Sequence, residues 1–113
     1  MNRKRYNQLP QVSFNILLAL SLKERHGYEI IKQVAEDSGG KIKLSPGALY
    51  ASIKQLNEQA MIAEVKRLAN PRRRYYRLTN KGRRQLGAEL KHYENTLQLA
   101  KQRHVLPIEA RHA

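Results

Sequence analysis

The stretch from Leu44 to Leu56, LSPGALYASIKQL, places small and cationic side chains where a helix would begin. Ser45 can accept a backbone N–H as the N-cap, and Pro46 suits the first helical position. Helical spacing predicts a buried face made of Leu49, Ile53 and Leu56. The rest of the helix would expose Ala48, Tyr50, Ala51 and Lys54. Because a helix start has unpaired N–H groups and a positive dipole end, these residues favour contact with an anion.

A run of arginines is the second candidate binding feature. Arg72, Arg73 and Arg74 lie between two strand-like segments, with Tyr75 directly after them, so they would occupy the tip of a hairpin. The basic residues around them, from Lys66 to Arg84, are not interrupted by any acidic residue. Since a solvated charge run usually mixes both signs, this cluster indicates a surface for a polyanion. The simpler alternative is that Tyr50 packs against the hairpin and Lys54 is an ordinary solvated lysine.

Residue types that carry catalysis or hold metals are poorly represented. There is no cysteine, and the four histidines are scattered without metal-ligand spacing. Glu89 and His92 are three residues apart, but such a pair on a charged helix is more typical of surface than of a site. His26 precedes Gly27 at a helix boundary, where capping or a core hydrogen bond is its expected role. We therefore predict no enzyme activity, no metal site and no cofactor.

The overall charge supports a polyanionic partner. Among 113 residues, 22 Lys and Arg against nine Asp and Glu give a formal net charge of +13. Such a basic domain favours DNA, RNA or an anionic membrane surface. The longest apolar run, residues 16–20, is far shorter than the roughly 18 residues of a membrane span. It is also short for a signal peptide, so we expect a cytoplasmic protein that does not enter a membrane.

The elements that must position these residues follow from periodicity. Helices are predicted from about Val12 to Gly27, over residues 28–37 and over residues 46–59, with a very short strand at 41–44. Residues 62–68 and 74–79 read as a two-stranded antiparallel hairpin. This order is that of a mainly α, winged helix-turn-helix fold, in which the third helix enters the DNA major groove and the hairpin is the wing. We expect a flexible basic arm at residues 1–8 and the winged domain at residues 9–79.

The last helix, capped by Thr79, is predicted to run to about His104. Its apolar residues alternate in steps of four and three, a heptad seam formed by Leu86, Leu90, Tyr93, Leu97 and Ala100. This spacing predicts a dimerisation helix at residues 80–106, followed by a frayed tail at 107–113. The alternative is that the helix packs only on Phe14, Leu17 and Leu18 of its own chain. Phe14, Leu18 and Tyr93 would line an effector pocket, although the same residues also make a normal core.

Three segments carry a family resemblance. HGYEIIKQV, GGKIKLSPGALYASIKQLNEQAMI and RRRYYRLTNKGRRQL resemble the PadR-like family of winged-helix transcriptional regulators, in order over roughly residues 10–90. The single C-terminal helix is similar to the compact subtype of that family. The resemblance implies a homodimer that binds a palindromic operator on double-stranded DNA, usually as a repressor that a small ligand relieves. Ala48 and Ala51 replace the threonine and proline frequent in the family, so base contacts at those positions do not carry over.

Two other hypotheses fit the composition. Tyr75 and Tyr76, beside arginines on a strand, could stack unpaired bases in an RNA-binding or ribosome-associated protein. Alternatively, the last helix could bind another chain in an architectural protein with little affinity for nucleic acid. The heptad seam and the helix-start chemistry favour the DNA-binding hypothesis over both.

Overall fold

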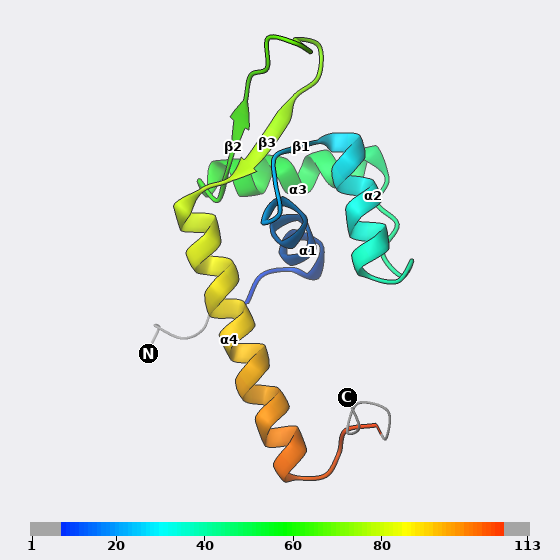
Figure 1. Ribbon diagram of the computed structural model, residues 1–113, viewed down its shortest axis with the longest axis vertical. Coiled ribbons are helices and arrows are strands. Elements are labelled where there is room, and N and C mark those ends of the chain that lie inside the picture. The colour runs from blue at the N-terminus through cyan, green and yellow to red at the C-terminus, as the bar shows by residue number, and fades with distance from the viewer. Residues whose placement is uncertain (1–7, 108–113) are drawn as a thin grey trace.

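The computed structural model describes residues 8–107, which form four helices and a small sheet (Figure 1). The helices are α1 (Gln11–Leu20), α2 (Gly27–Asp37), α3 (Pro46–Glu58) and α4 (Asn80–Gln102). The strands are β1 (Arg25–His26), β2 (Ile62–Val65) and β3 (Tyr75–Leu78). The mainly α winged-helix fold predicted from the sequence is confirmed.

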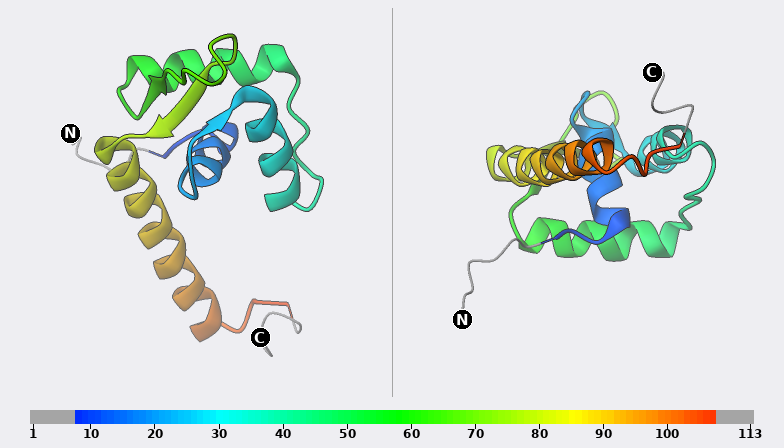
Figure 2. Two further views of the ribbon diagram at one scale, coloured as in Figure 1. Left: turned by 45° about the horizontal axis from the view of Figure 1, so that its top comes forward. Right: turned by 90° about the horizontal axis from the view of Figure 1, so that it is seen from below.

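Helix α1 lies at the centre of the domain. Seven of its ten residues are buried, because α2, α3 and α4 each pack against it (Figure 2). Ile16 and Leu17 are fully buried, and they join Ile30 of α2 and Leu49 of α3 in one hydrophobic core. The wide apolar face of this helix therefore packs against three helices and strand β3, and this packing fixes the angle at which α3 is presented.

The connection from α2 to α3 differs from the prediction. Helix α2 ends as expected, with Gly39 and Gly40 in the left-handed region. Residues 41–44, predicted as a strand, form a loop that pairs with no strand. The apolar residues Ile42 and Leu44 alternate with polar ones because both pack on the core. The N–H of Ile42 donates to the Ser38 hydroxyl at 2.9 Å and not to a neighbouring strand.

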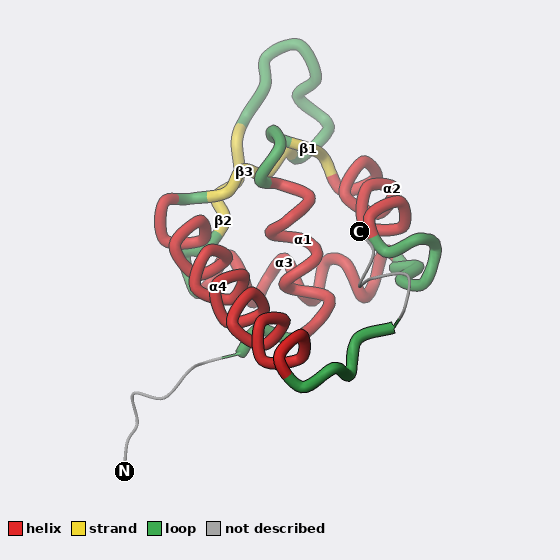
Figure 3. Tube along the Cα trace, turned by 60° about the horizontal axis from the view of Figure 1, so that its bottom comes forward, coloured by secondary structure: helices red, strands yellow, loops and turns green. Residues whose placement is uncertain are grey.

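The sheet has three antiparallel strands in the order β1-β3-β2, where two were predicted (Figure 3). Strand β1 pairs Arg25 with Tyr76 and His26 with Tyr75, so the residues before α2 are tied to the wing. The hairpin pairs are shorter than expected and stop at Val65 and Tyr75. We call residues 62–78 the wing and residues 66–74 its tip.

Helix α4 is anchored to the corner between α3 and β2. The Thr79 hydroxyl accepts the N–H of Gly82 at 3.0 Å, as predicted for the N-cap, and donates to the carbonyl of Ala60 at 2.7 Å. A β-carbon at Gly82 would collide with the carbonyl oxygen of Met61. Glycine at this position therefore allows the backbone of α4 to approach that corner closely.

Beyond its first turns, α4 extends away from the body of the domain (Figure 1). It passes α1, and there Glu89 is fully buried rather than exposed, so the prediction of a surface residue was wrong. Its carboxylate accepts the backbone N–H of Leu9 at 3.3 Å and the Tyr93 hydroxyl at 3.0 Å. Residues 1–7 of the predicted arm and 108–113 of the predicted tail lie outside the described residues; Leu9, next to the arm, is buried.

Candidate nucleic-acid interface

The first turn of α3 is open to solvent and built as the sequence predicts. The hydroxyl of Ser45 accepts the N–H of Ala48 at 3.1 Å, and Pro46 occupies the first helical position. All six predicted contact residues of this helix are exposed: Ser45, Pro46, Ala48, Tyr50, Ala51 and Lys54. Its small residues permit close approach of a polyanion, and its dipole favours negative charge.

Lys54 is the cation of this surface. Its ammonium group lies 3.8 Å from the carboxylate of Glu58, one turn further along α3, and both side chains are mostly exposed. An exposed pair of this kind contributes little stability and is readily exchanged for another anion. Lys54 is therefore available to a phosphate or a base edge.

Two arginines of the wing lie close to carboxylates. Arg67 pairs with Glu24 at 3.0 Å and lies over the ring of Tyr75, with its guanidinium carbon 4.0 Å from the ring centroid. Arg74 lies 4.0 Å from Glu64, although both are exposed. The predicted run without acidic neighbours is thus partly neutralised by carboxylates from outside the run.

Tyr75 is placed differently from the prediction. It is buried at the base of the wing, where its ring meets His26 edge to face at a centroid distance of 5.3 Å. Tyr76 is also buried, and burial raises the pKa of its hydroxyl, with the Glu64 carboxylate adding to the rise. Neither ring presents a face on which an unpaired base could stack, which removes the main support for the RNA-binding hypothesis.

His26 begins α2 and connects it to the wing. Its Nδ1 accepts the N–H of Glu29 at 3.4 Å, and the Glu29 carboxylate accepts the His26 N–H at 3.1 Å, so the two residues form a capping box. Partial burial opposes ionisation of Glu29, but the His26 N–H and nearby positive charges lower its pKa below the ordinary value. The other ring nitrogen, Nε2, faces Nη1 of Arg73 at 2.7 Å. The capping role predicted for His26 is confirmed.

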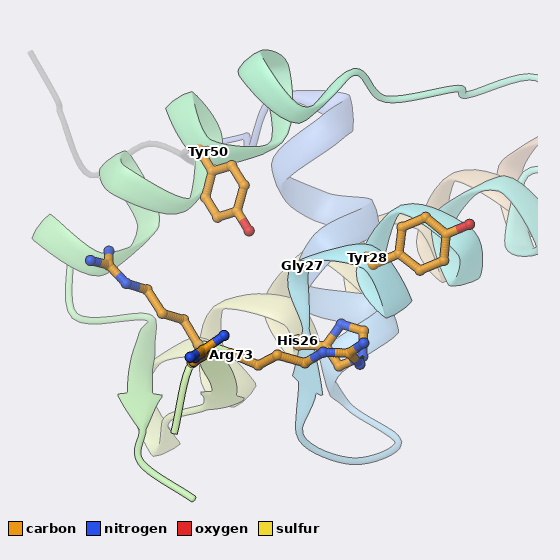
Figure 4. Close-up of a pocket in the computed structure, with 7 residues that line it drawn as sticks. His26, Gly27, Tyr28, Tyr50 and Arg73 are labelled. Carbon is orange, nitrogen blue, oxygen red and sulfur yellow. Dashed lines mark hydrogen bonds between the residues drawn. The ribbon is translucent and has the colours of Figure 1, made fainter. Parts of the chain in front are cut away.

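The start of α2, helix α3 and the tip of the wing border a cleft, which we call the α2–wing cleft (Figure 4). It has a volume of about 410 Å³ and is lined by His26, Gly27, Tyr28, Tyr50 and Arg72–Arg74. The hydroxyl of Tyr50 points towards Gly27, where a β-carbon would collide with it. The cleft thus brings α3, the start of α2 and the predicted arginines to one site.

The sequence analysis did not identify Tyr28 as a residue of this cleft. Tyr28 is the second residue of α2, and its side chain is 75% exposed. The signal that could have found it is the capping box His26–Gly27–Tyr28–Glu29. A residue at the second position of a capped helix projects near the helix start, close to any anion bound there.

The seam of α4 is divided between core and solvent. Leu86 is buried in its own domain, whereas Leu90 and Leu97 are 42% and 50% exposed. These two leucines line an open groove of about 500 Å³ together with Gly87, Lys91, Tyr93 and Glu94. Ala100, further along the predicted seam, is partly buried.

The residues of the predicted effector pocket pack closely in the described fold. Phe14 and Tyr93 meet edge to face at a centroid distance of 5.3 Å, and Leu18 is partly buried against the same core. Burial raises the pKa of the Tyr93 hydroxyl, and its hydrogen bond to Glu89 raises it further. Within one chain, Phe14, Leu18 and Tyr93 are therefore arranged as ordinary core residues.

Within residues 8–107, no three His, Asp or Glu side chains gather as metal ligands would. No described helix combines the length and the apolar character that crossing a membrane requires.

Comparison with known proteins decides the family. The profile of the transcriptional regulator PadR-like family matches residues 16–88, well over half of the chain. The chain belongs to the PadR-like family. It is therefore a DNA-binding transcription regulator, and α3 and the wing are its winged helix-turn-helix elements.

Several solved structures share this fold, and one of them is itself a PadR family regulator. A PadR family transcription regulator from Clostridium difficile R20291 is 27% identical, with a TM-score of 0.72 over 82% of this chain and 97% of that one. A transcriptional regulator from Clostridium thermocellum is 24% identical, with a TM-score of 0.68 over 80% and 87% of the two chains. RosR of H. salinarum is 26% identical, with a TM-score of 0.63 over 83% and 79%. Comparison with curated protein sequences gave no match.

Proposed function

We propose that this PadR-like chain is a homodimeric, sequence-specific repressor that binds a palindromic operator. The observation that carries the proposal is the exposed, capped first turn of α3 beside a basic wing. Tyr50 and Lys54 are exposed on α3, and Tyr50 and Arg72–Arg74 line the same cleft. A helix of this width fits the DNA major groove, which is about 12 Å across.

Within this proposal, residues 9–79 bind DNA and residues 80–106 dimerise. The N-terminal turn of α3, from Ser45 to Ala51, meets base edges and phosphates, with Lys54 one turn later. Arg72–Arg74 contact the backbone without reading sequence. Tyr75 supports the wing from beneath, because its ring is buried.

The dimer is supported by the exposed apolar groove on α4. Leu90 and Leu97 lose water contact when a second α4 packs on them, at about 25 cal/mol per Å² of apolar surface. Two recognition helices must lie about 34 Å apart to enter successive major grooves, and pairing through a long terminal helix can set that distance. A small effector would act where α4 packs on α1. A ligand bound beside Phe14, Leu18 and Tyr93 would change the angle between these two helices.

The experiment that tests this proposal is a competition in which unlabelled nucleic acids displace a labelled duplex from the protein. The purified protein is bound to a fluorescent duplex and challenged with unlabelled duplex DNA or single-stranded RNA at about 150 mM salt. We expect duplex DNA to compete far better than RNA, because A-form and single-stranded RNA do not offer the groove that α3 fits. Equal competition by RNA would favour the RNA-binding hypothesis, and no binding of either would favour the architectural one.

A further inference from the structure

Arg25 in strand β1 is a buried arginine whose hydrogen bonds are incomplete. The residue is only 8% exposed, and its Nε–H donates to the carbonyl of Ala19, near the end of α1, at 2.9 Å. That contact uses one of the five N–H groups of the guanidinium. Within residues 8–107 the other four have no hydrogen-bond partner, and no carboxylate forms an ion pair with Arg25. Since buried polar groups are nearly always paired, these donors are left for an acceptor that the fold does not supply.

A second cleft, with a volume of about 250 Å³, runs along α2 beside Arg25, and we call it the Arg25 cleft. Its other lining residues are Glu29, Lys32, Gln33 and Glu36. They occupy the i, i+3, i+4 and i+7 positions of the helix and therefore share one face of α2. The Arg25 cleft is distinct from the α2–wing cleft, because no residue lines both.

The charges around the Arg25 cleft restrict the kind of ligand that fits it. Two cationic side chains, Arg25 and Lys32, line the cleft together with two carboxylates, Glu29 and Glu36. A simple anion is attracted by the first pair and repelled by the second, and a simple cation meets the opposite conflict. A small molecule that carries both charges satisfies both pairs at once.

Glu36 is the carboxylate available to the positive group of such a ligand. An oxygen of Glu29 accepts the His26 N–H at 3.1 Å in the capping box, so Glu29 is held at the start of α2. Glu36 is exposed, and its side chain forms no ion pair within residues 8–107. The amide of Gln33 donates to Asp37 at 2.8 Å and leaves Glu36 free.

We propose that the Arg25 cleft binds a free amino acid, with its carboxylate on the guanidinium of Arg25 and its ammonium group on the carboxylate of Glu36. An arginine binds a carboxylate through two parallel hydrogen bonds, which uses donors that the fold leaves unpaired. The volume of about 250 Å³ lies just below the roughly 300–1,000 Å³ of sites for drug-sized ligands and suits so small a molecule. The site does not depend on the proposed function, because none of its residues belongs to α3 or to the wing.

The first experiment titrates the ¹⁵N-labelled protein, without DNA, with each of the twenty protein amino acids and follows the Nε–H resonance of Arg25. We expect at least one of them to shift this resonance with a Kd below about 1 mM. Acetate and methylamine each carry one of the two charges, and we expect both to bind at least about tenfold more weakly. An equal response to acetate would overturn the assignment to an amino acid. No response to any amino acid would overturn the site and leave the free donors of Arg25 to water.

The second experiment measures by calorimetry how variants at each end of the site bind the best of these amino acids. A lysine can still donate to the Ala19 carbonyl, so Arg25→Lys keeps the charge but loses the paired N–H groups. We expect Arg25→Lys and Glu36→Gln each to weaken binding about tenfold.

The matched control is Asp37→Asn, because Asp37 is the next residue of α2, does not line the cleft, and as asparagine can still accept from Gln33. This control should bind the amino acid like the wild type. Glu36 is exposed, so Glu36→Gln keeps the test decisive even if Arg25→Lys does not fold. Unchanged binding in Glu36→Gln, or an equal loss in Asp37→Asn, would overturn the proposal.

Discussion

Lys54 and Tyr50 are the residues whose exposure most directly links α3 to base recognition. Lys54 projects away from the buried Leu49, Ile53 and Leu56, whereas Tyr50 is 47% exposed and points its hydroxyl towards Gly27. Changing Lys54 therefore alters the exposed surface of α3 without removing core contacts. In the proposed complex the arginines of the wing contact the DNA backbone, so their loss should affect all sequences alike.

We predict that Lys54→Ala weakens binding to a selected operator about tenfold and weakens binding to unrelated duplexes much less. A good contact to a base edge contributes about 1–3 kcal/mol of discrimination, whereas the loss of one surface charge affects every duplex equally. Fluorescence anisotropy with both duplexes at one salt concentration measures the ratio. Lys101→Ala removes the same charge from the last turn of α4 and should leave the ratio unchanged. Equal losses on both duplexes would contradict a specificity role for Lys54.

At the scale of elements, the contact of α4 with the corner between α3 and β2 decides how the winged domain and the C-terminal helix are joined. Gly82 packs against the carbonyl of Met61, and Thr79 donates to the carbonyl of Ala60. Lys81 adds a hydrogen bond to the carbonyl of Gln59 at 2.8 Å. This corner fixes the direction in which α4 leaves the domain.

We predict that Gly82→Ala destabilises the protein by about 1–3 kcal/mol, because the added carbon forces the backbone of α4 away from Met61. Urea unfolding followed by circular dichroism at one protein concentration measures the loss. Gly47→Ala is the matched control: it lies in the first turn of α3, where the nearest atom to an added carbon is the Ser45 hydroxyl at 4.0 Å, and alanine favours a helix. An unchanged midpoint for Gly82→Ala would show that the close contact does not constrain α4.

Periodicity and capping signals predicted where the helices begin, since all four begin at the expected residue or within one of it. The end of the first helix was predicted wrongly, because α1 stops at Leu20 and does not continue to Gly27. The short strand β1 was missed because Arg25 and His26 are too few to show alternation, and they pair with residues about fifty positions later. Residues 41–44 were predicted wrongly because alternation reports burial and not strand pairing. Glu89 was missed because its burial depends on Leu9, from the other end of the chain. The α2–wing cleft likewise requires segments that only the fold brings together.

At the scale of the whole molecule, the exposed groove of α4 accounts for the proposed assembly. Leu97 and Leu99 offer a direct comparison, because they are 50% and 46% exposed on the same helix but face different sides. Only Leu97 belongs to the heptad seam and lines the groove. The proposed dimer should therefore depend on Leu97 and not on Leu99.

We predict that Leu97→Lys shifts the protein towards monomer and lowers operator affinity at least tenfold, since pairing of the helices would have to desolvate an ammonium group. The Glu94 carboxylate in the groove already pairs with Lys91 at 3.4 Å. Leu99→Lys should remain dimeric and bind normally. Sedimentation equilibrium and operator titration measure both effects on the same samples. Equal behaviour of the two variants would argue against the seam as the subunit contact.

Selection of bound sequences from a random duplex pool tests the central claim most directly, because it measures specificity and symmetry together. We predict enrichment of an inverted repeat whose half-site centres are about 10 base pairs apart, or a multiple of that spacing. This spacing matches two α3 helices in major grooves on one face of the duplex. Enrichment of a single unrepeated site, or recovery of the pool without enrichment, would contradict a dimeric reader of a palindromic operator.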